Sequence, residues 1–175
     1  MTDTEEIAHQ SIIEPVELET VKAYIGYSPT VGDDDRFLLN SIRSARARLE
    51  DRMGCAIARR DFVTRSFDVS PGERVTIPLL RPLRAVRSVV FIDTGGDSEP
   101  CESYSVRPGN GASVFVDVPP NVTEVRVTYS SGYDVCPEPI KTAIMLLVKA
   151  DNDRTTEDVI GPLRPMLQKY WNDNI

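Results

Sequence analysis

Residues 33–54 read DDDRFLLNSIRSARARLEDRMG, and this stretch predicts one amphipathic helix. Its apolar side chains recur at steps of three or four residues, so they share one continuous helical face. The acidic residues at its start can cap free backbone N–H groups and oppose the helix dipole, and Gly54 suits the position after its end. We therefore predict a helix over residues 33–53. Its apolar face consists of Leu38, Ile42, Ala45, Leu49 and Met53.

Two further segments have helical periodicity. The first covers residues 15–25, where Pro15 suits the first turn and Gly26 follows the end. The second covers residues 137–152 and is so apolar that we expect it at the centre of the core. The apolar residues are Leu18, Val21 and Ile25 in the first segment, and Ile140, Ala143, Ile144, Leu147 and Val148 in the second.

Between these helices, residues 60–130 carry the signals of short strands. Several runs are rich in β-branched or aromatic residues, and turn sequences built from Gly, Pro, Asn and Asp separate them. Residues 93–98 predict a hairpin tip. The runs are Asp61–Val69, Arg74–Pro78, Val86–Asp93, Ser103–Arg107, Ser113–Asp117 and Thr123–Tyr129. Together the elements predict an α+β fold, with a small helical bundle core, an inserted antiparallel β region and a C-terminal extension.

The length of 175 residues suits one domain better than two. We expect a flexible acidic arm over residues 1–14, one domain over residues 15–154 and a tail over residues 155–175. The tail carries apolar and aromatic side chains, which are typical of a segment that docks into a groove of a partner. Packing of the tail on its own domain is the alternative. The proposed docking residues are Leu163, Met166, Leu167, Tyr170 and Trp171.

The formal charge of −7 is unevenly distributed along the chain. Residues 1–35 hold nine acids and one base, residues 36–87 hold twelve bases and five acids, and residues 88–175 hold seven bases and thirteen acids. Such segregation can set a basic surface of one copy against an acidic surface of the next, or place a basic patch beside nucleic acid. Mixing of these charges within the fold is the alternative.

Four arginines of the 33–53 segment lie largely off its apolar face. Direct nucleic-acid binding would favour aromatic residues among them for stacking on bases, and these are absent. A solvated face or a subunit contact is the favoured role. We interpret as subunit-interface or channel charges the residues Arg43, Arg46, Arg48 and Arg52.

No motif of the sequence points to catalysis. The only histidine, His9, lies in the predicted arm, where a base is not held in the fixed geometry that catalysis needs. Cys55, Cys101 and Cys136 form neither a CxxC pair nor a Cys/His cluster, so we expect free thiols. Asp33–Asp35 lack the ligand spacing of a calcium loop, and helix capping is their favoured role. We expect no enzyme activity, no metal and no cofactor.

No membrane segment is expected either. No stretch approaches the ~20 consecutive apolar residues that a transmembrane helix needs. The first ten residues, MTDTEEIAHQ, are acidic and lack the apolar core of a signal peptide. We expect residence in a cytoplasm and no membrane partner.

Four blocks of the sequence together resemble one known family. They are Leu18–Ile25; Asp33–Asp35 followed by Leu38–Leu39, Ile42, Ala45, Leu49–Glu50 and Gly54; Val75–Pro78 with Pro82–Leu83, Val86 and Ser88–Val89; and Val125–Tyr133 with Pro137, Pro139–Lys141, Ala143–Ile144 and Leu146–Leu147. In this order, over about residues 16–154, they resemble the head–tail connector (adaptor, or head-completion) proteins of long-tailed bacteriophages and gene transfer agents.

The resemblance implies a structural subunit that forms a twelve-fold ring under the portal protein, links the capsid to the tail and surrounds a channel for DNA. The C-terminal segment would reach the portal, and another surface would meet neck, stopper or tail proteins. Duplex DNA would pass without sequence-specific binding. The expected location is the head–tail junction of the virion, after assembly in the host cytoplasm. The alternatives are another neck or tail protein (a stopper or tail terminator) and a metal-dependent hydrolase that uses the clustered carboxylates.

Overall fold

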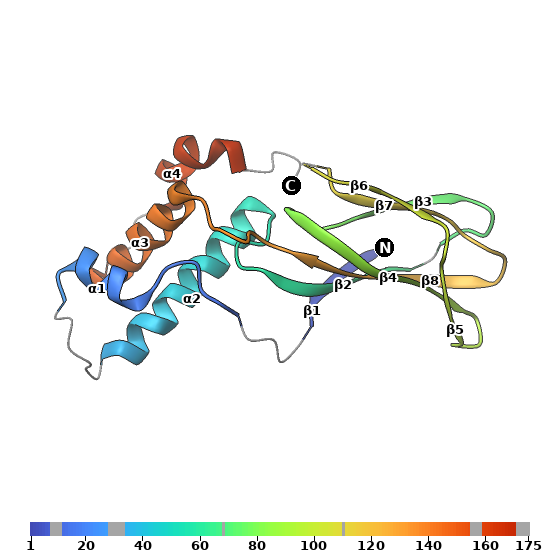
Figure 1. Cartoon of the computed structure of the whole chain (residues 1–175), viewed down its shortest axis with the longest axis horizontal. Coiled ribbons are helices and arrows are strands. Elements are labelled where there is room, and N and C mark those ends of the chain that lie inside the picture. Colours follow the sequence, from blue (N-terminus) through green and yellow to red (C-terminus); the bar gives the residue numbers. More distant parts are fainter. Residues whose placement is uncertain (8–11, 28–33, 68, 110, 155–158, 171–175) are drawn as a thin grey trace. The chain divides into compact units, whose positions relative to one another are not determined.

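The computed structural model divides into two compact units (Figure 1). The helical unit comprises Ile13–Ala58 and Tyr133–Ile175, and the β unit comprises Met1–Ile12 and Arg59–Gly132. The β region is therefore inserted in the sequence of the helical unit, and the predicted α+β class is confirmed. The single domain expected over residues 15–154 spans parts of both units. The structure describes residues 1–7, 12–27, 34–67, 69–109, 111–154 and 159–170.

The described residues of the helical unit form helices close to the predicted positions. Three helices match the predicted segments except at their starts. The first begins later than expected because Glu17 is still extended (φ −75°, ψ 147°), and it ends at Gly26, whose φ of 80° is left-handed. None of the described helices is long and apolar enough to span a membrane. The elements are α1 (Leu18–Ile25), α2 (Asp34–Met53), α3 (Glu138–Asn152), α4 (Ile160–Leu167) and the 3-10 helix η1 (Gln168–Tyr170).

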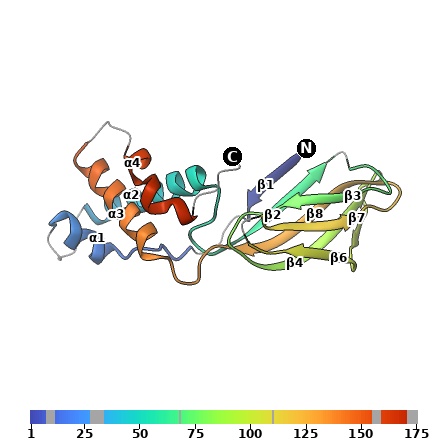
Figure 2. The same cartoon turned by 90° about the horizontal axis from the view of Figure 1, so that it is seen from above.

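The apolar faces of α2 and α3 form the core of the helical unit (Figure 2). Both predicted apolar sets are almost completely buried, which confirms the helical periodicity as the signal for this core. α1 adds Val21, and α4 adds Ile160 and Leu167. The buried residues from α2 and α3 are Leu38, Ile42, Ala45, Leu49, Met53, Ile140, Ala143, Ile144, Leu147 and Val148.

The described residues of the β unit form two antiparallel sheets, visible as two layers in Figure 1. One sheet has the strand order β1-β2-β8-β4-β5, and the other has the order β3-β7-β6. The predicted hairpin tip is confirmed, because Ile92 of β4 pairs with Ser98 of β5. The strands are β1 (Thr2–Glu6), β2 (Arg60–Phe67), β3 (Arg74–Pro78), β4 (Leu83–Asp93), β5 (Ser98–Pro100), β6 (Tyr104–Arg107), β7 (Ser113–Asp117) and β8 (Val122–Ser131).

The first residues differ from the flexible arm expected over residues 1–14. Thr2–Glu6 forms β1, which pairs along its whole length with β2. All five side chains of the strand are exposed, so neither of its faces requires apolar residues. Its sequence therefore lacks the alternation of apolar and polar residues that predicts a half-buried strand. The backbone ladder holds it, together with a bond between the Thr4 and Thr64 hydroxyl oxygens (2.8 Å).

The inner face of the five-stranded sheet centres on Tyr129, which is completely buried. Its ring stacks on Phe62, with 5.7 Å between centroids. Its hydroxyl oxygen accepts hydrogen bonds from the Leu80 N–H (3.1 Å) and the Thr64 hydroxyl (3.3 Å). Burial raises the pKa of Tyr129, and these hydrogen bonds only partly offset that effect.

Replacing Tyr129 with phenylalanine is expected to lower the free energy of unfolding of the β unit by about 1–3 kcal/mol, because the Leu80 N–H loses its acceptor. The wild type should also lose stability at alkaline pH. A tyrosine whose folded pKa is raised contributes stability that is present below its unfolded pKa of about 10 and is lost as the pH rises toward the folded pKa. Urea unfolding from neutral to alkaline pH measures both effects. Tyr104→Phe, at a half-exposed position, is the matched control and should change neither.

Candidate interaction surfaces

The predicted docking residues of the tail divide between the core and the surface. Leu167 is completely buried in the core of the helical unit. Leu163 and Tyr170 are half-buried against that core, and the Tyr170 ring meets Tyr133 edge-on, with 6.3 Å between centroids. Met166 is 38% exposed, and Trp171 lies outside the described residues. The described part of the tail therefore packs on its own unit, and Met166 is its exposed large apolar side chain.

Other large apolar side chains of the helical unit are also exposed. Singly exposed apolar residues are normal on a protein surface and do not by themselves mark an interface. They mark the apolar area that the described part of the unit leaves exposed. Besides Met166, these residues are Ile13, Tyr24, Phe37 and Val135.

The four arginines of α2 occupy different environments. Arg43 is 62% exposed and Arg52 is exposed, as expected for surface charges. Arg48 is partly exposed and pairs with Asp151 of α3 at 2.5 Å. Arg46 is buried, so its interpretation as an interface or channel charge does not fit the described structure. Its helical position is on the border of the apolar face, and two carboxylates compensate its charge there.

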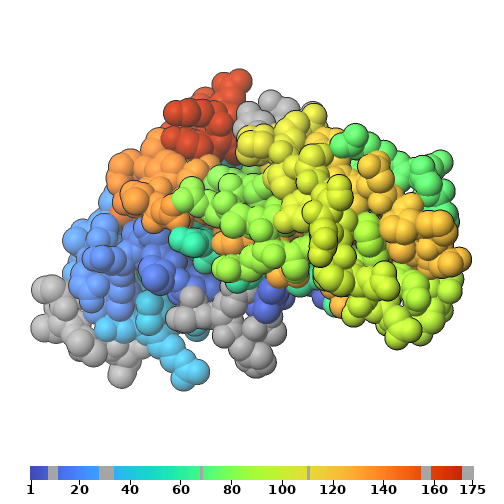
Figure 3. Space-filling view, turned by 45° about the vertical axis from the view of Figure 1, so that its right-hand side comes forward, coloured from blue at the N-terminus to red at the C-terminus, as the bar shows by residue number. Residues whose placement is uncertain are grey.

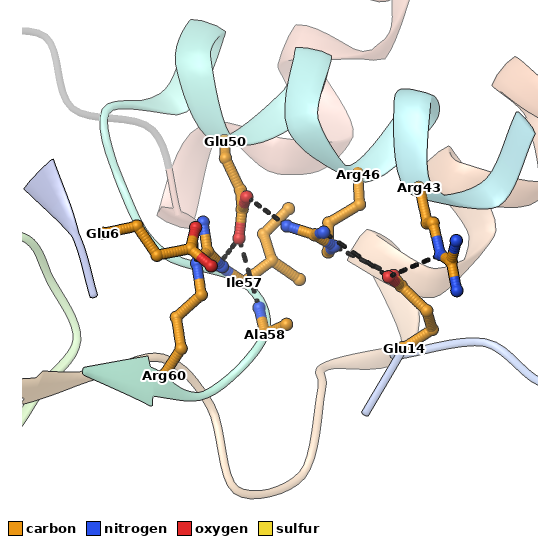
Figure 4. Close-up of polar contacts among 8 residues, drawn as sticks. All are labelled: Glu6, Glu14, Arg43, Arg46, Glu50, Ile57, Ala58 and Arg60. Carbon is orange, nitrogen blue, oxygen red and sulfur yellow. Dashed lines mark hydrogen bonds and ion pairs between the residues drawn. The ribbon is translucent and has the colours of Figure 1, made fainter. Parts of the chain in front are cut away.

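Arg46 and Glu50 form the centre of a buried polar network in the helical unit (Figure 4). Arg46 Nη1 donates to Glu50 Oε2 at 2.6 Å, and Arg46 Nε donates to Glu14 Oε2 at 2.9 Å. The other Glu50 oxygen accepts the backbone N–H groups of Ile57 (2.6 Å) and Ala58 (3.2 Å). Charge-assisted hydrogen bonds of this length are among the stronger ones in proteins.

The network holds residues at which the chain enters and leaves the helical unit. Glu14 is the second residue of its first segment, and Ala58 is the last residue before the chain passes to the β unit. Tyr133 is the first residue after its return, and its N–H donates to the Ile57 carbonyl at 3.1 Å. No sequence motif marks Glu14 or Glu50 as a partner of Arg46. The i,i+4 spacing of Arg46 and Glu50 was a usable signal for one of these contacts.

The acidic start of α2 has a structural role. Asp34 and Asp35 lie in its first turn, as expected for residues that oppose the helix dipole. The Asp35 carboxylate also pairs with the buried ammonium of Lys22. Asp33 and His9 lie outside the described residues. No group of three His, Cys, Asp or Glu side chains within the described ranges is placed to hold a metal ion.

The three cysteines are buried, and none of them forms a disulfide in the described structure. Cys55 is 3% exposed, Cys101 is 8% exposed and Cys136 is 9% exposed. Burial raises the pKa of Cys136 to about 12, so its reactive thiolate form is scarce near neutral pH. Thiol reagents should therefore react slowly with the native protein.

Comparison with known proteins gives a fold relationship. No protein-family model and no curated protein matches the chain. The chain is similar to a chain in the neck of an empty GTA particle computed with C6 symmetry, with a TM-score of 0.79 and 16% identity over 99% of this chain and 97% of that chain. It is also similar to a chain in the virion of a native gene transfer agent (GTA) particle, with a TM-score of 0.75 and 16% identity over 98% and 96%.

A third similar chain comes from the neck of a native GTA particle computed with C12 symmetry. The TM-score is 0.67 at 16% identity, over 95% of this chain and 97% of that chain. At this level of identity the likeness shows a shared fold. Because the likeness covers nearly the whole length of each chain, it includes the helical elements and the inserted strands alike.

Proposed function

We propose that this chain is a structural subunit of the neck of a tailed phage or gene transfer agent, and that it serves there as the head–tail adaptor. The observation that carries the proposal is the fold likeness to a GTA neck chain over 99% of this chain and 97% of that one. The resemblance of four sequence blocks to head–tail connector proteins supports the same role independently of the structure.

A ring is the assembly that this proposal requires. The compared necks were computed with C6 and C12 symmetry, which are symmetries of rings. In a cyclic ring of identical subunits, one head-to-tail contact is repeated around the axis. We propose a twelve-fold ring that binds the portal on one side and neck or tail proteins on the other. Duplex DNA would pass through the channel without sequence-specific binding.

A structural role is favoured over catalysis by how the charged side chains are used. Asp35 pairs with Lys22, and Glu50 binds Arg46 and two backbone N–H groups. These carboxylates therefore stabilise the helical unit. The helical unit also favours an adaptor over a stopper or tail terminator, since those proteins are more purely β-built.

Met166 of α4 is the described residue through which the proposed portal docking is best tested. It projects from the tail, and its 38% exposure leaves apolar area for a partner. Burying an apolar side chain contributes roughly 1.5–3 kcal/mol before ordering costs. A ring repeats this contribution in every subunit, so modest anchors add up to strong attachment.

The test mixes purified protein with portals from its own particle and images the products by electron microscopy. The wild type is expected to form a ring on one portal face. Met166→Asp should weaken attachment about tenfold or more, because it introduces a charge at an apolar contact. Phe37→Asp, a matched change at an exposed apolar residue of α2, should attach normally. Normal attachment of Met166→Asp would refute docking through α4, and failure of the wild type to join portals or necks would refute the adaptor role.

A further inference from the structure

The four edge strands that the structure describes in the β unit differ in how well they are protected against pairing with another chain. Natural edge strands carry charges or proline, or are very short. β5 has three residues and ends at Pro100, and β3 ends at Pro78. β1 carries three acids among its five residues, which protect it against pairing with an acidic or neutral edge but not with a basic one. β6, with the sequence YSVR, has one charged residue at its end and no proline. β6 is therefore the least protected edge.

The apolar side chains of β6 are uncovered. Tyr104 lies opposite Val116 and Val106 lies opposite Val114 in the register of β6 and β7. The two β7 valines are at most 1% exposed, whereas Tyr104 is 37% and Val106 is 40% exposed. The apolar inner face of the three-stranded sheet thus continues to an open edge, and the yellow segment that includes β6 lies at the surface in Figure 3.

Two arginines lie near the other face of β6, and one of them, Arg74, is also 4.0 Å from the exposed Asp117 carboxylate. Arg107 ends the strand, and its guanidinium lies 5.3 Å from the centre of the Phe115 ring. Arg74 lies 5.9 Å from the same ring centre, and it donates to the Ser105 hydroxyl at 3.1 Å. An extended segment that pairs with β6 is therefore favoured if it carries acidic side chains.

β1 offers such a segment at the edge of the other sheet. Its five residues are all exposed, and among the described strands it pairs with β2 alone. Glu5 contacts Arg65 at 3.4 Å in an exposed pair, which is weak enough to leave the Glu5 carboxylate available to a neighbour. Glu6 accepts a hydrogen bond from the buried side chain of Arg60 at 2.7 Å and is held more firmly. Asp3 completes an edge with three acids and no base.

We propose that the open edge of β6 in one copy pairs with the open edge of β1 in the next copy, so that strand addition forms the head-to-tail contact of the ring. This inference rests on the proposed function. The two edges belong to different sheets, so the contact is heterologous and can repeat around an axis. Pairing of β6 with β3 would bring Arg107 toward Arg74, and like charges disfavour that arrangement.

Cross-linking tests the contact directly. A chain carrying both Thr2→Cys and Ser105→Cys is assembled into necks or portal-bound rings and treated with a short bismaleimide. The expected product is a ladder of covalent oligomers on a denaturing gel, while each single-cysteine chain remains monomeric. The buried native thiols give a low background, which the unsubstituted chain measures.

The outcomes separate this contact from the proposed function. Rings seen by electron microscopy without a ladder would overturn the contact and leave the adaptor role intact. Dimers from Ser105→Cys alone would show that β6 pairs with β6, which also overturns it. A chain that enters no ring would overturn both proposals.

A charge reversal is the second test of the contact. Arg107→Glu should lower the ring yield about tenfold, and adding Asp3→Lys and Glu5→Lys to that variant should restore the yield. An unchanged yield for Arg107→Glu, or no rescue by the two lysines, contradicts the proposed pairing.

Discussion

Replacing Glu50 with alanine is expected to lower the free energy of unfolding of the helical unit by about 3–5 kcal/mol. The Glu50 side chain is 9% exposed and accepts from Arg46 Nη1, Ile57 N and Ala58 N. Alanine removes the acceptor of all three donors. A buried donor left without an acceptor costs about 1–3 kcal/mol, and Arg46 would keep only Glu14 as a partner.

Urea unfolding followed by far-ultraviolet circular dichroism measures this loss, because the helices dominate that signal. Arg43→Ala is the matched control on the same helix. Arg43 is 62% exposed and approaches Glu14 only to 4.0 Å, so its loss should change the free energy of unfolding by less than about 0.5 kcal/mol. Equal values for the two variants would show that the network does not stabilise the unit.

The double variant Arg46→Met with Glu50→Gln shows whether charge is needed in this network. Glutamine keeps an oxygen for the Ile57 and Ala58 N–H groups, and methionine fills the space of the arginine stem. No unpaired buried cation remains, and Glu14 keeps Arg43 nearby. We expect this double variant to be more stable than Glu50→Ala, since removing one partner of a buried pair costs more than replacing both. A double variant as unstable as Glu50→Ala would mean that the ion pair itself is required.

The helical core was predictable from sequence because its signal is local. Residues such as Leu38 and Ile42 recur at the helical period, and a helix must bury such a face. The same logic predicted α3, where Ile144 and Leu147 are completely or almost completely buried. The period says which residues point inward. It does not say that the inserted strands form a unit of their own, which depends on contacts between residues distant in sequence.

The charged side chains show where local patterns fail. Arg46 was interpreted as an interface charge because it lies off the main apolar positions of α2. Its role depends on Glu14, 32 residues earlier in the chain and inside the stretch expected to be a flexible arm. β1 was missed for a related reason. A strand that buries no side chain has no hydrophobic period, and only its partner β2 gives it a place.

The tail illustrates a pattern with two valid interpretations. Leu163, Met166, Leu167 and Tyr170 follow the spacing of one helical face, and α4 does form over the first three of them. An apolar helical face can dock on a partner or on its own unit, and the sequence pattern is the same in both cases. In the described structure the two neighbouring residues differ, because Leu167 is completely buried in its own unit and Met166 is 38% exposed.

Leu167→Ala is expected to lower the free energy of unfolding of the helical unit by about 2–5 kcal/mol, because the side chain is completely buried and its loss leaves a cavity in the core. Met166→Ala, one residue earlier and 38% exposed, should cost less than about 1 kcal/mol. Urea unfolding of both variants measures the difference. Equal, small losses would mean that α4 does not contribute to the core and that the whole tail is free to dock.

The expected difference in stability between the two variants determines how the portal experiment must be designed. Deleting the tail would remove a core residue together with the proposed anchor. Substitution of Met166 therefore tests docking, and substitution of Leu167 tests folding.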